Sequence, residues 1–92
     1  MHEATFLRAL LRRIDEIAAA ESATRVTAVT VRLGALSQMS PDHFREHWDV
    51  AAAGSIAQDA VLTTELSDDL TDANALDVTL VSIDVEDPEP AS

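Results

Sequence analysis

Val26-Thr27-Ala28-Val29-Thr30-Val31-Arg32-Leu33 is the stretch that decides the fold of this 92-residue chain. β-Branched residues dominate it, and its second half alternates apolar and polar positions. Side chains of a strand point alternately to its two faces, so the pattern predicts a β-strand with one apolar face. Neighbouring elements must bury that face, and the flanking sequence supplies candidates on both sides.

Amphipathic helices are predicted before and after this strand. From Thr5 to Ala20 apolar residues recur at spacings of three and four, which is one face of a helix. Ser40 and Pro41 are typical of an N-cap and a first helical residue, and Gly54 is typical of a helix end. The second helix therefore runs from Pro41 to about Ala53. The apolar face of the first helix comprises Phe6, Leu7, Leu10, Leu11, Ile14, Ile17 and Ala18.

Two further strands are predicted in the second half, at Val61–Leu66 and 76–86. The apolar phase of the last strand flips between Leu80 and Val81, which indicates a β-bulge. The fold class is therefore α+β, a small three-stranded sheet with two helices packed on one face, in the order helix-strand-helix-strand-strand.

The acidic connection 67–75 is too short for a helical crossover, so we expect the last two strands to pair as an antiparallel hairpin. On the last strand we expect Val81, Ile83 and Val85 to face the helices. Residues 1–86 are expected to form one domain, with 67–75 as a short link and 87–92 as a flexible tail.

Composition restricts the function classes. The formal charge is −11, the six basic residues are all arginine, and the last of them is Arg45. From residue 46 onward there are twelve acids and no base, which disfavours a nucleic-acid partner. No stretch approaches a membrane span, and arginines interrupt the first apolar positions, so we expect a cytoplasmic protein with no membrane partner. The chain has no cysteine and hence no disulfide or thiolate site.

The first three residues, Met1-His2-Glu3, carry metal-binding chemistry. The α-amine, the backbone nitrogens of His2 and Glu3 and the His2 imidazole can converge on one cation. Four nitrogens in a plane suit Ni(II) or Cu(II). These groups must lose protons to bind, so affinity should fall as pH drops. Glu3 can add a carboxylate or interact with the positive end of the helix. The alternative interpretation is an incidental histidine at a frayed terminus.

A second candidate lies on the second helix, where His43 and His47 are four residues apart and share a face. With Asp42 or Glu46 they form a weaker alternative site for a transition metal. The structural interpretation is two partly exposed histidines beside the packed aromatic Trp48. For catalysis the sequence offers no nucleophile-elbow motif and no glycine-rich phosphate loop, so we expect no enzyme activity and no catalytic residues.

Several of these stretches together resemble the HypA/HybF family of nickel metallochaperones of hydrogenase and urease maturation. The resemblance begins at Met1-His2-Glu3 and continues through the first helix. It includes Val31-Arg32-Leu33-Gly34-Ala35-Leu36-Ser37, which is similar to the family's first strand and its Gly-x-Leu-Ser turn, and Val81-Ser82-Ile83-Asp84-Val85-Glu86, which is similar to its closing strand. Pro41 and Gly54 bound the second helix as in the family.

The resemblance implies transient binding of Ni(II) by Met1, His2 and Glu3, and delivery of nickel to a [NiFe] hydrogenase. It implies the hydrogenase large subunit and a nickel-handling maturation GTPase as partners. Exposed sheet edges add a homodimer to the expected partners. Family members carry a zinc domain with two Cys-x-x-Cys pairs before the last strand, where this chain has only 67–75, so no zinc is expected. The alternative function is a metal-independent interaction module that keeps the fold and docks on a hydrogenase or its maturation partners.

Overall fold

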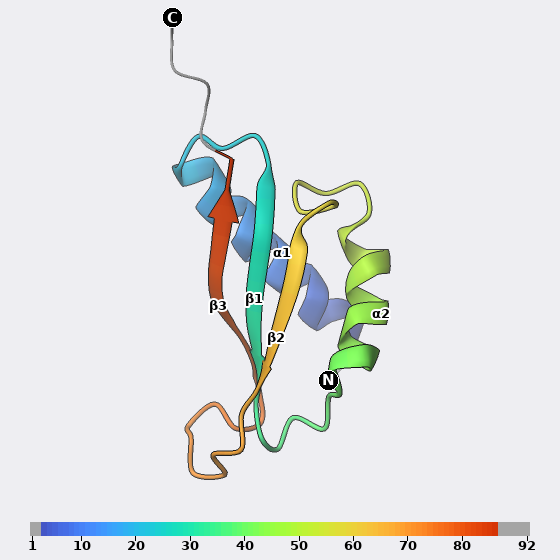
Figure 1. The fold of residues 1–92 in the computed structure, drawn as a ribbon, viewed down its shortest axis with the longest axis vertical. Helices are drawn as coiled ribbons and strands as arrows, with labels where there is room; N and C mark the ends of the chain where they lie inside the picture. The colour runs from blue at the N-terminus through green and yellow to red at the C-terminus, as the bar shows by residue number, and fades with distance from the viewer. Residues whose placement is uncertain (1–2, 87–92) are drawn as a thin grey trace, which may run out of the picture.

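A computed structural model describes residues 3–86 of the chain. The element order is helix, strand, helix, strand, strand, as the sequence predicts (Figure 1). Met1, His2 and the expected tail 87–92 lie outside the described residues. The elements are α1 (Glu3–Ala20), β1 (Val26–Leu33), α2 (Pro41–Ala52), β2 (Val61–Leu66) and β3 (Val78–Val85).

The three strands form one sheet in the order β2-β1-β3, with β1 in the centre. β1 pairs in parallel with β2, from Ala28 opposite Val61 to Leu33 opposite Leu66. On its other side β1 pairs antiparallel with β3. The expected hairpin between the last two strands is therefore wrong, because β2 and β3 lie on opposite edges of the sheet (Figure 1).

The connection through α2 explains this arrangement. A parallel pair needs a crossover, and α2 supplies a helical one between β1 and β2. The parallel register brings the last residues of β1 and β2, Leu33 and Leu66, to the same end of the two strands. Segment 67–77 then passes the end of β1, and β3 begins there and runs back along its free side. Segment 67–75 is too short for a helical crossover between β2 and β3, but it is long enough to cross the end of β1 without a helix.

The register between β1 and β3 shifts at two places, between Val26 and Ala28 and between Thr30 and Val31. The second shift changes which side chains of β3 reach the core. Thr30 lies opposite Ser82 and Val31 opposite Leu80, so Val81 is the extra residue on β3. The predicted bulge at Leu80 and Val81 is thereby confirmed. Its consequence for Val81 differs from the expectation, since this side chain is 42% exposed instead of facing the helices. Ile83 and Val85 are partly buried and pack against the core, as expected.

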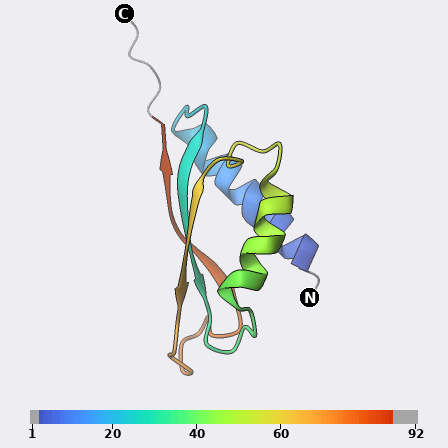
Figure 2. The same cartoon turned by 45° about the vertical axis from the view of Figure 1, so that its right-hand side comes forward.

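Both helices cover one face of the sheet, and no other element within residues 3–86 covers the opposite face (Figure 2). The predicted apolar face of α1 is buried at four positions, and Phe44, Trp48 and Ala52 of α2 are buried beside it. From β1, Val29, Val31 and Leu33 complete this layer, each without exposed surface. The buried residues of α1 are Leu7, Leu10, Ile14 and Ala18.

Local chemistry fixes the ends of α2. The Ser40 hydroxyl accepts a hydrogen bond from the backbone N–H of His43 at 3.2 Å, and Pro41 occupies the first turn, so the predicted N-cap is confirmed. At the other end Gly54 takes a φ of +81°, a conformation that favours glycine. The Arg45 guanidinium donates to the carbonyl oxygen of Leu62 at 2.8 Å and ties α2 to β2.

Segment 67–77 is attached to the end of β1 by backbone hydrogen bonds. The Ser67 N–H donates to the Leu33 carbonyl at 3.0 Å, and the Gly34 N–H donates to the Asp77 carbonyl at 2.9 Å. Gly34 permits this approach, because a Cβ there would meet the carbonyl group of Ala75, with the Asn74 oxygen at 2.7 Å. A glycine at position 34 is therefore required by packing and not by its φ angle.

Gly34→Ala is expected to destabilise the protein by about 2–4 kcal/mol, through overpacking and weakened loop hydrogen bonds. Gly54→Ala is the matched control, since a Cβ at Gly54 meets nothing within 4 Å and only the backbone strain of about 1 kcal/mol remains. Urea unfolding followed by Trp48 fluorescence measures both variants. Equal losses of stability would contradict the close approach at Gly34.

Candidate metal site at the start of helix α1

The last of the three predicted nickel-binding residues, Glu3, begins α1. Met1 and His2 are outside the described residues. The first four N–H groups of a helix have no partner within it, so the helix does not engage the backbone nitrogen of Glu3. This nitrogen is one of the four predicted ligands, and the helix start leaves it available.

The charge at a helix start bears on which complex can form there. The macrodipole places a partial positive charge at the amino end, which disfavours an uncompensated cation. The same partial charge favours loss of a proton from a nearby amide. A four-nitrogen complex with two deprotonated amides neutralises the two charges of Ni(II). The predicted ligand set is therefore compatible with a helix amino terminus, where a bare divalent cation is not.

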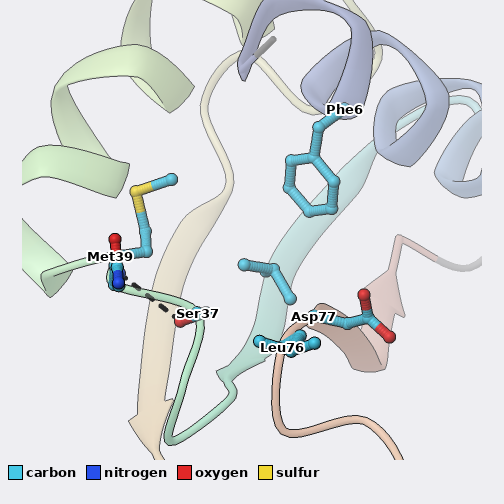
Figure 3. Close-up of a pocket in the computed structure, with 7 residues that line it drawn as sticks. Phe6, Ser37, Met39, Leu76 and Asp77 are labelled. Carbon is cyan, nitrogen blue, oxygen red and sulfur yellow. Dashed lines mark hydrogen bonds between the residues drawn. The ribbon is translucent and has the colours of Figure 1, made fainter. Parts of the chain in front are cut away.

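A cavity of about 280 Å³ adjoins the beginning of α1 (Figure 3). Phe6 of α1 projects toward Leu76 and Asp77, which precede β3, and Met39 lies across from them. The remaining lining residues are Ser37, Gln38 and Val78. The cavity thus joins three parts of the chain that are distant in sequence.

The loop from β1 to α2 forms one wall of this cavity. The Leu36 N–H donates to the Ala75 carbonyl at 2.7 Å, which fixes the loop to segment 67–77. Gln38 has a φ of +59°, in the left-handed region that non-glycine residues seldom adopt. The Met39 N–H then points back to the Ser37 hydroxyl at 3.4 Å (Figure 3). The loop is held by its backbone as much as by its side chains.

Sequence reasoning missed this cavity. The sequence gives Met39 no role, and it places Asp77 in the strand predicted at 76–86, whereas β3 begins at Val78 in the structure. They line the same cavity because segment 67–77 crosses the end of β1, and strand pairing between distant segments sets that path. The closest sequence signal is Gly34, whose missing side chain permits the crossing.

The alternative pair, His43 and His47, lies on the solvent-exposed face of α2. Their ring centroids are 4.6 Å apart and the ring planes are tilted by 59°. Among the described residues no group of three or more His, Cys, Asp or Glu is arranged to hold a metal ion. The structure therefore brings the two histidines together but adds neither Asp42 nor Glu46 as a third ligand.

One carboxylate outside this region has a perturbed pKa. The Asp69 Oδ1 accepts hydrogen bonds from the Thr71 hydroxyl at 2.7 Å and the Thr71 N–H at 2.9 Å. These bonds lower the pKa of Asp69 below its ordinary value of 3.8. Because the pKa is lowered in the folded protein, these hydrogen bonds contribute their full stabilisation above the ordinary pKa of 3.8. The contribution is lost as pH falls from there through the lowered pKa. Asp69 thus shapes an exposed turn of segment 67–77 at neutral pH.

No helix within residues 3–86 combines the length and the apolar character that crossing a membrane requires. This finding agrees with the amphipathic pattern of α1, whose polar face carries arginines and acids.

Comparisons with known proteins find a matching family, similar sequences and a similar structure. The family model described as "Hydrogenase/urease nickel incorporation, metallochaperone, hypA" matches residues 1–73. The chain is 36% identical over 76 residues to the hydrogenase maturation factor HypA of Archaeoglobus fulgidus, covering 83% of this chain and 67% of the relative. It is 36% identical over 62 residues to HypA of Dechloromonas aromatica, covering 67% of this chain and 55% of the relative. The chain thus spans about half to two thirds of these curated relatives.

The fold also matches a solved structure, the solution structure of the Ni metallochaperone HypA from Helicobacter pylori. The TM-score is 0.80 at 17% sequence identity, and the match covers 96% of this chain and 100% of the other. At this identity the likeness concerns the fold, and the sequence matches carry the family relationship.

Proposed function

The chain belongs to the HypA family of hydrogenase and urease nickel-incorporation metallochaperones, and from that premise we propose that it binds Ni(II) at its amino terminus and delivers it for hydrogenase maturation. The ligands in this proposal are the Met1 α-amine, the backbone nitrogens of His2 and Glu3 and the His2 imidazole. The observation that carries it is the match of the family model from residue 1, together with a helix that begins at Glu3.

The proposed mechanism is capture and release of the metal, without a covalent step. Binding requires deprotonation of the amine, the imidazole and two amides, so release is favoured by their protonation. Reference pKa values of about 6.5 for the imidazole and about 7.7–8.0 for the amine place this competition close to neutral pH. Nickel is the cargo in this scheme, and the protein is not an enzyme.

The proposed partners are a hydrogenase large subunit and a nickel-handling GTPase, with the cytoplasm as the compartment. We further propose that residues 1–86 correspond to the nickel-binding part of the family, with 67–75 in place of the zinc domain. The absence of cysteine supports this assignment, because a structural zinc site uses mainly Cys and His ligands. Hydrogen bonds from 67–77 to β1 further support a sheet that is complete without an inserted module.

His2→Ala is expected to abolish the tightest Ni(II) site, since it removes the imidazole from the chelate. The measurement is nickel titration of the untagged protein, followed by the visible absorption band that square-planar Ni(II) develops. His43→Ala is the control and should keep the band. A band of full intensity in His2→Ala would show that nickel binds elsewhere, and His43 with His47 would become the better candidates.

Moving the amine away should weaken nickel binding as strongly as His2→Ala. A Gly-Ser-Gly-Ser extension before Met1 keeps every side chain and displaces only the amino group. A single added residue is unsuitable, because an amine, two amides and a histidine at the third residue form another four-nitrogen chelate. Equilibrium dialysis compares the extended and native proteins. Unchanged affinity in the extended protein would exclude the α-amine as a ligand.

A further inference from the structure

The exposed face of α2 carries two imidazoles in a chelating arrangement. His43 and His47 are separated by one helical turn, and their ring centroids lie 4.6 Å apart. An ion with bonds of about 2.0–2.1 Å to two imidazoles holds their nitrogens about 3 Å apart. The ring nitrogens lie at the rims of the rings, so a centroid separation of 4.6 Å is compatible with one nitrogen from each ring at this separation.

The backbone that presents these rings is rigid. Each histidine directly precedes a buried aromatic residue, Phe44 or Trp48, with 1% and 2% of its surface exposed. These two aromatic rings stack with centroids 6.3 Å apart and anchor the same two turns of α2. Ser40 caps the helix at the His43 N–H, and Arg45 ties it to Leu62. The spacing between the histidines is therefore built into the packed helix.

The charge around the pair favours a cation. Asp42, Glu46 and Asp49 lie on the exposed surface of α2, and its one basic residue, Arg45, donates to the Leu62 carbonyl. A divalent ion near this surface is attracted by these carboxylates. Because no third His, Cys, Asp or Glu within residues 3–86 completes a site, an ion held here keeps open coordination positions. Such a site binds and exchanges an ion, whereas catalytic zinc sites use three protein ligands.

α2, the helix that carries the pair, packs against α1. Both views show the first turn of α1 beside α2 (Figures 1 and 2). Phe6 of α1 and Met39, which directly precedes the N-cap residue of α2, line the same cavity.

We propose that His43 and His47 form a second, open site for a divalent transition-metal ion, distinct from the amino-terminal nitrogens. The two imidazoles supply two ligands, and water or a partner's side chain fills the remaining positions. That nickel is the ion bound during function rests on the proposed function, whereas binding of divalent ions by the pair does not.

The test uses the full chain with His2→Ala, which removes the terminal chelate. Isothermal titration with Ni(II) and with Zn(II) should show one remaining site in this background. Adding His43→Ala or His47→Ala should weaken that site at least tenfold, because a single imidazole cannot chelate. The exposed positions of both side chains predict an unchanged fold, which circular dichroism checks.

The matched control keeps the number of histidines constant. His47→Ala combined with Asp49→His places the second imidazole six residues from His43, on a different face of α2, and should not restore binding. Asp49→Asn alone, in the same background, should leave the affinity within about threefold. With Zn(II), the imidazole NMR signals of His43 and His47 should shift together.

Equal affinity with and without His47, or restored binding with Asp49→His, would overturn the proposal. This test of the histidine pair can be distinguished from the test of the amino-terminal site. The square-planar band of the native protein reports the terminal nitrogens, while titration in the His2→Ala background reports the histidine pair.

Discussion

The central position of β1 is the constraint on which the rest of the structure depends. β1 is hydrogen-bonded on both edges, and its apolar face at Val29, Val31 and Leu33 has no exposed surface. Two connections lie at the carboxyl end of β1: the loop that leads into α2 leaves β1 there, and segment 67–77 crosses it before β3. The helical crossover through α2 and segment 67–77 meet at this end, and there they form the cavity beside the start of α1. Burial of one strand thus determines where the candidate site can be built.

Local chemistry made the elements predictable. Ser40-Pro41 marked the start of α2, the alternation in 26–33 marked β1, and the phase change at Leu80 and Val81 marked a bulge that the register confirms. Pairing was not predictable in the same way. The sequence argument compared only β2 with β3, while the structure uses α2 to join β1 and β2 in parallel. Strand pairing depends on every connection at once, and a single link length does not decide it.

At the candidate site, too, the sequence predicts features built from neighbouring residues and does not predict features built from distant segments. The nickel chemistry of Met1-His2-Glu3 follows from functional groups adjacent in sequence, so it could be proposed without a structure. The cavity formed by Phe6, Met39 and Asp77 could not, because three distant segments create it. The pair His43 and His47 lies between these two cases. The helical spacing predicts that the two side chains are close, and the structure adds the distance of 4.6 Å between their ring centroids. The family relationship supports nickel handling by this chain, and the assignment of that role to the first of these features is our proposal.

The two proposed metal sites differ in charge, and this difference separates their behaviour. Nickel bound by two deprotonated amides is a neutral complex, which the positive end of α1 tolerates. Nickel bound by two neutral imidazoles keeps both positive charges and lies among the carboxylates of Asp42, Glu46 and Asp49. Since exposed charges interact through a screened potential, added salt should weaken the histidine pair more than the terminal chelate. In these two proposals the acidic surface of α2 concentrates cations at low selectivity, while the terminal nitrogens select the metal by their planar geometry.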